Sequence, residues 1–406
     1  MTRHVCALAF ACAVGGAGAS VSAQTASTTG ADPSDAARFK WGVLRFTPSI
    51  AVSNVGVDNN VFNETQDPKQ DTTAAVGPAV NLWLKMGPSR LSGNASGQYL
   101  YFKTYENQRS WNTSNKGRWE LPLSRITPFV AGSLTDTQDR PGYEIDSRAR
   151  LKTTSYGLGT SVRLSGKTSL VLAGTRSIVA FDENQSYLGA DLSQALNRRS
   201  GAQESQIRVE LTPLTTFVIR SEAIQDRFDS EPVRNADSFS VMPGFEFRPQ
   251  ALISGTAFVG VRHFNVLGET LPDYTGLIAS VGTKYTVAAT QFEVKVARDL
   301  SYSYQVLQPY YVLTDVGLSM TERVTRAWDI VGRGGWQSLA YRNVNNVSIA
   351  SRTDHGSQYG GGLGYRLGTT FRLGFDAVYY RRQSPRQSRD YSGLRFGGSL
   401  SYGLQQ

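Results

Sequence analysis

Residues 371–380 read FRLGFDAVYY. Every second residue from Phe371 to Tyr379 is apolar, and the residues between them are mostly polar or small. Successive side chains of a β-strand point to opposite faces, so this alternation predicts a strand with one apolar and one polar face.

The same alternation recurs in residues 155–164 (SYGLGTSVRL) and 239–248 (FSVMPGFEFR). From Val43 onward the chain divides into such segments, separated by turn residues. We predict eighteen strands: 43–54, 74–86, 90–105, 110–121, 126–138, 149–164, 168–181, 202–212, 216–228, 238–248, 253–264, 275–286, 290–303, 309–321, 326–341, 355–367, 370–382 and 390–404.

The connections between these strands alternate in length. Those after the even-numbered strands are short, and the first four are 87–89, 122–125, 165–167 and 213–215. The longest follow odd-numbered strands: 55–73, 139–148, 182–201, 229–237, 265–274 and 342–354. Short turns at one rim and long loops at the other are typical of a bacterial membrane barrel, whereas a soluble sandwich has no reason to sort its loops by parity.

Composition favours the same fold class. The hydrophobic fraction of 40% is below the globular norm of about 45–50%. After the first residues there is no run of about 20 apolar residues that could form a membrane helix. We therefore predict an all-β, transmembrane, antiparallel up-and-down β-barrel over 41–406. The loop 182–201 is expected to contain a helical turn that folds into or over the mouth.

The first residues resemble a secretory signal peptide, 1–23. Arg3 precedes a short alanine-rich apolar stretch that ends in VSA, which predicts Sec-type export and cleavage near Ala23. A lipoprotein site at Cys12 is the competing interpretation. Residues 24–40 are rich in Thr, Ser, Ala and Asp and predict a disordered periplasmic lead-in to an outer-membrane protein.

Catalysis and cofactors are not expected. Both cysteines, Cys6 and Cys12, lie in the leader, and His263 and His355 have no ligand-spaced neighbour. We predict no cofactor, no metal and no enzyme activity, and an outer-membrane hydrolase is kept as an alternative function. The glycines 360–362 and 364 lack the ending of a phosphate-binding loop and are interpreted as a strand that a loop or glycan can approach.

The polar faces of the strands predict a basic lumen. Arg3 is the leader's single charged residue, so its removal changes the formal net charge only from +9 to +8. The expected carboxylates of the lumen are Glu120, Glu246, Glu293, Asp329 and Asp376. The expected basic lining is Lys85, Lys116, Arg118, Arg163, Arg248, Arg262, Lys295, Arg333, Arg366, Arg372 and Arg395.

Two hypotheses follow from this basic lining. The pore prefers anionic solutes or acidic glycans, because positive walls concentrate anions. Alternatively, the charges form ion-pair ladders that hold the wall rigid.

A second basic cluster, Arg381, Arg382, Arg386 and Arg389, is placed in the outer loop before the last strand. Nucleic acid is not an expected partner, because the leader directs the protein away from it. Contact with lipopolysaccharide phosphates and a plain solvated loop are the two interpretations. Outer-membrane lipid is the remaining expected partner, and the oligomeric state stays open.

Residues 226–247 read DRFDSEPVRNADSFSVMPGFEF, preceded by PLTT at 213–216. This stretch resembles a family of outer-membrane β-barrel porins whose members are often associated with exopolysaccharide export. The resemblance implies a pore that conducts a polymer delivered by periplasmic export proteins, and it brings no catalytic residue. A plugged structural or adhesin-like barrel is the other alternative. The chain ends YGLQQ, without the terminal aromatic residue usual in such barrels.

Overall fold

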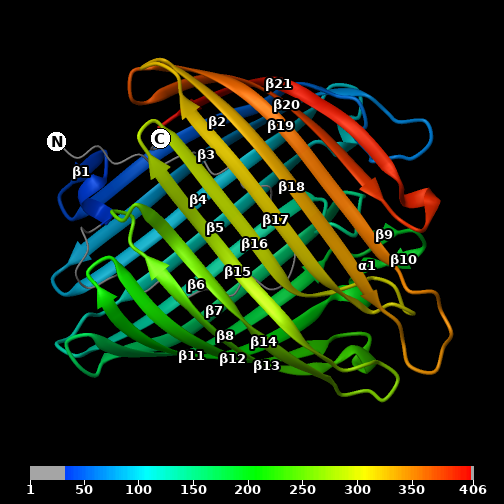
Figure 1. The fold of residues 1–406 in the computed structure, drawn as a ribbon, viewed down its shortest axis with the longest axis horizontal. Helices are drawn as coiled ribbons and strands as arrows, with labels where there is room; N and C mark the ends of the chain where they lie inside the picture. Colours follow the sequence, from blue (N-terminus) through cyan, green and yellow to red (C-terminus); the bar gives the residue numbers. More distant parts are fainter. Residues whose placement is uncertain (1–32, 404–406) are drawn as a thin grey trace.

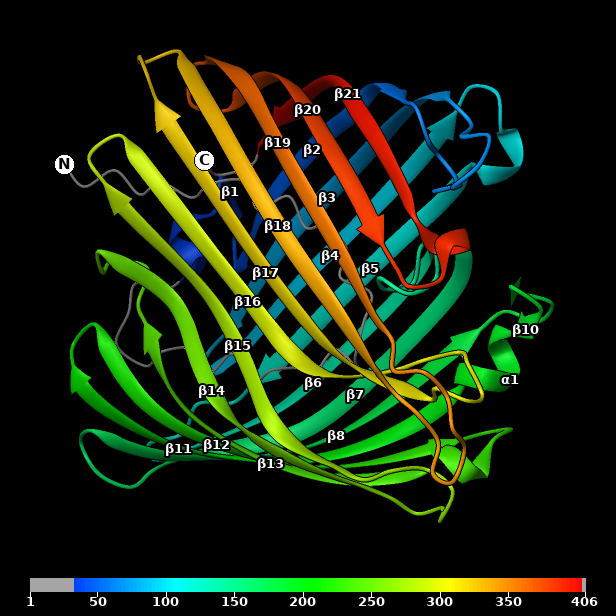
Figure 2. The same ribbon diagram turned by 45° about the vertical axis from the view of Figure 1, so that its right-hand side comes forward.

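The computed structural model describes residues 33–403 and shows a closed antiparallel β-barrel of eighteen long strands, which confirms the predicted fold class. The tilted strands run around a single lumen (Figures 1 and 2). They are β2 (Leu44–Asp58), β3 (Asp71–Met86), β4 (Ser89–Phe102), β5 (Ser110–Glu120), β6 (Ile126–Asp139), β7 (Ala149–Arg163), β8 (Thr168–Phe181), β11 (Arg198–Thr212), β12 (Thr215–Phe228), β13 (Ala236–Phe247), β14 (Ile253–Val266), β15 (Tyr274–Val287), β16 (Thr290–Tyr302), β17 (Tyr310–Arg323), β18 (Trp328–Arg342), β19 (Thr353–Leu367), β20 (Phe371–Gln383) and β21 (Tyr391–Tyr402).

Each strand pairs with its neighbours in sequence, and β2 pairs with β21 to close the ring. The closing pair contains a bulge between Val52 and Val55. The short strand β1 (Phe39–Trp41) folds back and pairs with residues 44–46 of β2, where β21 has already ended. This arrangement covers an edge that would otherwise present unpaired backbone groups.

The two rims differ as the loop lengths predict. The tight turns lie at one rim, drawn at the left in Figure 1, and the long loops gather at the other. The tight turns are 87–88, 121–125, 164–167, 213–214, 248–252, 288–289, 324–327 and 368–370. The longest connection, between β8 and β11, carries the small strands β9 (Ser186–Tyr187) and β10 (Ala190–Asp191) and the expected helical turn, α1 (Leu192–Leu196).

The outer face of the wall is apolar and uncovered. Leu158 and Leu277 are 69% and 61% exposed, and Val259, Leu318 and Phe375 are also more than half exposed. A band of this kind is stable facing lipid and unstable facing water. None of the helices within residues 33–403 is long and apolar enough to cross a membrane.

The glycines of β19 were expected to let a loop or glycan approach the wall. In the structure they make room for side chains of the neighbouring strands. Gly360, Gly362 and Gly364 lie between β18 and β20 on the lumen side, and a Cβ at Gly364 would be 2.4 Å from the carboxylate of Asp329. The Arg372 guanidinium also occupies this space. The side chains of an ion pair between β18 and β20 therefore fill the room that the glycine leaves.

The N-terminal segment also differs in part from the prediction. Residues 33–40, the end of the predicted disordered lead-in, form a 3-10 turn at Pro33–Ala36 and the start of β1. The turn is held by Arg45 of β2, which is ion-paired with Asp35. The predicted signal peptide 1–23 and the last residues, 404–406, lie outside the described residues.

Candidate functional site

Three cavities line different parts of the lumen wall between the tight-turn rim and the long-loop rim. We call them the rim cavity (about 280 Å³), the middle cavity (about 270 Å³) and the outer cavity (about 220 Å³). Their lining residues come from the polar faces of the strands. The sequence alternation places these side chains inward, since the apolar partners of each strand point outward.

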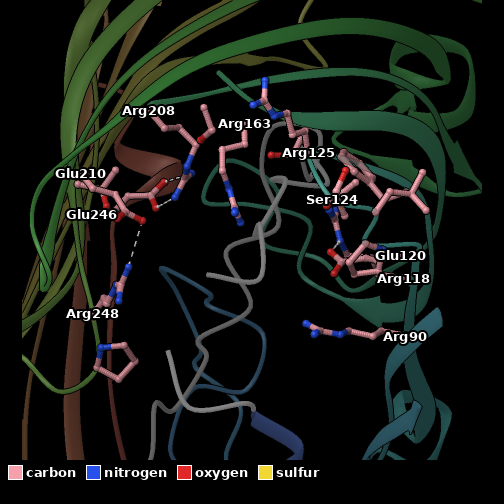
Figure 3. A pocket seen from close by; sticks show the side chains of 18 of the residues that line it. Arg90, Arg118, Glu120, Ser124, Arg125, Arg163, Arg208, Glu210, Glu246 and Arg248 are labelled. Atoms are coloured by element: carbon pink, nitrogen blue, oxygen red, sulfur yellow. Dashed lines mark hydrogen bonds and ion pairs between the residues drawn. The ribbon is translucent and has the colours of Figure 1, made fainter. Parts of the chain in front are cut away.

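The rim cavity is rich in arginine. Figure 3 shows Arg90 and Arg163 pointing into it, with Arg118, Arg208 and Arg248 on its wall. Its remaining basic residue belongs to the tight turn 121–125, Arg125. The carboxylates that line it are fewer: Glu120, Glu210 and Glu246.

Half of these arginines are ion-paired across or along the strands. Arg118 Nε lies 2.5 Å from a Glu120 carboxylate oxygen, and Arg208 Nη2 lies 2.6 Å from Glu246. Arg248 Nη2 is 3.3 Å from Glu210. These three pairs correspond to the ion-pair ladders that were one of the two hypotheses for the basic lining.

The side chains of Arg90, Arg125 and Arg163 have no hydrogen-bond or ion-pair partner among residues 33–403. A guanidinium presents five N–H donors in a planar fork that matches carboxylate and phosphate groups. The rim cavity therefore has free donors and a net positive charge, the properties of an anion-binding site.

The basic character continues around the tight-turn rim. Register places Lys85 opposite Arg90, Lys284 opposite Glu293 and Arg323 opposite Asp329, on the lumen face. We call this set the basic rim: Arg45, Lys85, Arg90, Arg118, Arg125, Arg163, Arg208, Arg248, Lys284, Arg323, Arg366 and Arg372. The carboxylates at the same level are fewer: Asp35, Glu120, Glu210, Glu246, Glu293 and Asp329.

The middle cavity contains an ion-pair network across β18, β19 and β20. Asp329 is fully buried and accepts hydrogen bonds from Arg366 Nε at 2.7 Å and from Arg372 Nη2 at 2.6 Å. Arg333 Nη2 lies 2.6 Å from Asp376 in a second pair that also crosses β19. Lys295 and Arg395 line the same cavity.

The outer cavity has the opposite charge balance. It is lined by two arginines, Arg198 and Arg262, and by the carboxylates Glu204, Glu222, Asp226 and Asp299. Arg262 bridges Asp299 at 3.0 Å and Glu222 at 3.4 Å. The positive charge of the lumen wall is therefore concentrated at the tight-turn rim.

The residues expected to line the lumen thus divide as follows. Arg118, Arg163 and Arg248 line the rim cavity, and Arg262 lines the outer cavity. The residues that line the middle cavity are Lys295, Arg333, Arg366, Arg372 and Arg395. Lys85 and Lys116 line none of the three cavities, although register places each of them opposite a lumen-facing residue.

At the long-loop rim, loops from different parts of the ring contact one another inside the barrel. The β6–β7 loop, 140–148, reaches the opposite wall, where Tyr143 donates a hydrogen bond to Asp315 of β17 at 3.2 Å. Glu144 is buried and accepts hydrogen bonds from Ser303 Oγ at 2.7 Å and Gln305 Nε2 at 3.1 Å. We call the loop 140–148 and its buried contacts the mouth plug.

An apolar cluster supports the mouth plug from the side. Ile145 packs with Leu192 and Leu196 of α1 and with Tyr304 of the β16–β17 loop, all of them buried. The expected helical turn of the long β8–β11 loop therefore packs against the mouth plug. The contribution of loop 140–148 was missed, because its charges look like those of any solvated loop.

The basic cluster before the last strand is divided by the structure. Arg381 and Arg386 are exposed, and their contact with lipopolysaccharide stays a prediction. Arg382 and Arg389, each 4% exposed, were wrongly assigned to an exposed loop. Arg382 lies on the lumen face of β20, and both side chains turn inward to the carboxylate of Asp146.

Within residues 33–403, no group of three or more His, Cys, Asp or Glu side chains is placed to hold a metal ion. His263 Nδ1 contacts Thr275 Oγ1 at 2.8 Å, and His355 stacks on Trp336.

Residues 32–401 match the family described as putative beta-barrel porin 2. The chain belongs to this porin family. The porin is a channel of the bacterial outer membrane and not an enzyme, as its sequence predicts. Since bacterial barrels place short turns in the periplasm, the basic rim faces the periplasm and the mouth plug faces outward.

No curated protein sequence matches this porin. OpdK from Pseudomonas aeruginosa is 11% identical, with a TM-score of 0.49 over 88% of this chain and 98% of its own. A BenF-like porin from Pseudomonas fluorescens Pf-5 is 10% identical, with a TM-score of 0.47 over 89% and 99%. The siderophore receptor PirA from Pseudomonas aeruginosa is 9% identical, with a TM-score of 0.41 over 88% and 80%.

Proposed function

We propose that this porin passes anionic hydrophilic solutes and that the basic rim captures them on the periplasmic side. The observation that carries the proposal is the set of arginines Arg90, Arg125 and Arg163 in the rim cavity, whose side chains have no partner within residues 33–403. An ion-pair ladder explains Arg118, Arg208 and Arg248 but gives these three no structural role. Positive charge at an entrance raises the local concentration and entry rate of anions.

Replacing all three unpaired arginines by glutamine should lower the chloride-to-potassium permeability ratio by about tenfold, because three uncompensated positive charges leave the entrance. The measurement is the reversal potential of the purified barrel in a planar bilayer under a KCl gradient. Arg326→Gln is the matched control, since this exposed arginine lies in the tight turn 324–327 and lines none of the three cavities. An unchanged ratio in the triple variant would show that these arginines do not select the solute.

We infer that the anionic cargo is an exopolysaccharide with acidic sugars. Two arguments support this inference: the resemblance of residues 226–247 to porins associated with polymer export, and a basic rim on the side from which a polymer arrives. Deletion of the gene should abolish secreted polymer. The wild-type gene and Arg326→Gln should restore it, and the triple glutamine variant should restore much less. Unchanged polymer after deletion would refute the export role and leave passage of small anions intact.

A further inference from the structure

One carboxylate of the mouth plug, that of Asp146, is bound to arginines of another segment. Asp146 of loop 140–148 lies 3.2 Å from Arg382 Nη1 and 3.1 Å from Arg389 Nη2. It also accepts hydrogen bonds from Tyr187 at 3.1 Å and from Asn63 at 3.3 Å. Asp146 is therefore the point where three other outer segments hold this loop.

The arginines that bind Asp146 belong to a buried basic group. Arg352, Arg382 and Arg389 are each 4% exposed, and Asp354, which is fully buried, accepts hydrogen bonds from Arg352 and Arg382. Asp354 belongs to the wall strand β19, whereas Asp146 belongs to a loop. Asp354 therefore stays beside these arginines as part of the wall, whereas Asp146 leaves them if loop 140–148 moves.

Each of these three arginines keeps at least one buried N–H group without a partner. They are Nη1 of Arg352 and the Nε groups of Arg382 and Arg389. A buried donor without an acceptor costs free energy, so the site is not saturated by its own carboxylates. A carboxylate that approaches these arginines from the lumen would find donors in addition to those that Asp146 uses.

We propose that Arg382 and Arg389 form a second anion site, in which a carboxylate of the transported solute replaces Asp146 and releases loop 140–148 from the mouth. The inference rests on the proposed passage of anions, since the solute must reach the plug through the lumen. In the closed state the carboxylate of Asp146 occupies this site, and the solute carries the same chemical group. A solute that binds only the open state shifts the equilibrium by its differential affinity.

The rest of the loop is compatible with release. The carboxylate of Glu144 is held by neutral donors, Ser303, Gln305 and the backbone N–H of Tyr304. The backbone carbonyls of Tyr143 and Glu144 accept hydrogen bonds from Arg382 and Arg389, so a solute that binds these two arginines competes for these contacts as well. Burial raises the pKa of the Glu144 carboxyl, because the charged form loses its hydration. Release of the loop returns this carboxyl to water and removes the desolvation cost of its charged form, which favours the open state.

Single-channel recording of the mature barrel tests this gate. Asp146→Asn should raise the open probability by about tenfold or more, because it weakens two charge-assisted hydrogen bonds. Asp182→Asn is the matched control, since this loop carboxylate lies 3.9 Å from the exposed Arg150 and outside the plug. An open probability of Asp146→Asn equal to that of the wild type, in a barrel that still migrates as folded, would overturn the proposal.

The ligand is tested with galacturonate as the carboxylated probe and galactose as its neutral counterpart. Galacturonate should raise the open probability of the wild-type channel, galactose should not, and Arg382→Gln should abolish the response. Equal effects of the two sugars would overturn the second anion site. The chloride preference set by the basic rim is measured separately, so loss of gating with retained anion preference refutes this inference alone.

Discussion

Asp329→Asn is expected to lower the free energy of unfolding of the barrel by about 3 to 5 kcal/mol, the usual cost of removing one partner from a buried ion pair. Asp329 is fully buried and is the shared acceptor of Arg366 and Arg372, at 2.7 Å and 2.6 Å. An asparagine keeps the shape but leaves two guanidinium groups without a compensating charge. The loss should therefore exceed that of an exposed ion pair, about 0 to 1 kcal/mol.

The measurement is reversible unfolding of the barrel by denaturant in lipid vesicles, followed by tryptophan fluorescence. Asp229→Asn serves as the control, because its carboxylate is 41% exposed and lies 3.4 Å from the exposed Arg199. It should change the free energy of unfolding by less than about 1 kcal/mol. A similar small change for Asp329→Asn would contradict the buried network that we describe for β18, β19 and β20.

Leu158→Arg should destabilise the barrel by about 2 to 4 kcal/mol, the known cost of an arginine on the lipid face near the middle of a membrane. Leu158 lies near the centre of β7 and is 69% exposed on the outer face of the wall. In the membrane this surface contacts hydrocarbon, so a charge there loses its hydration.

Ser161→Arg is the matched comparison on the same strand. Ser161 lines the rim cavity and therefore faces water in the lumen. The same denaturant titration should show a much smaller loss of stability for this variant than for Leu158→Arg. Equal losses would mean that the two faces of β7 are assigned incorrectly.

The wall of the barrel was predictable because side chains alternate between the two faces of every strand. A strand such as β20 must place Phe371, Leu373 and Phe375 on one face. Counting such segments gives the number of strands, and the parity of the loops then makes that number even and distinguishes the two rims. All eighteen strands and both rims were found in this way. The lumen side of Arg118 and Arg163 follows from the same alternation.

The contacts inside the barrel could not be predicted, since they depend on strands and loops that are distant in sequence. The partners of Asp329 come from β19 and β20, and a glycine at 364 provides their space. Arg382 and Arg389 looked like solvated loop residues because their acceptor, Asp146, is more than two hundred positions earlier. A sequence shows which residues are charged but not which loops fold inward.

The most direct test of the account is the sign of the reversal potential of the wild-type barrel in a planar bilayer under a KCl gradient. Arg90, Arg125 and Arg163 have no side-chain partner among the residues that the structure describes, and basic groups are in excess at the periplasmic rim. Both features predict that chloride is more permeant than potassium. Potassium preference would contradict the central claim that this porin is a channel for anions.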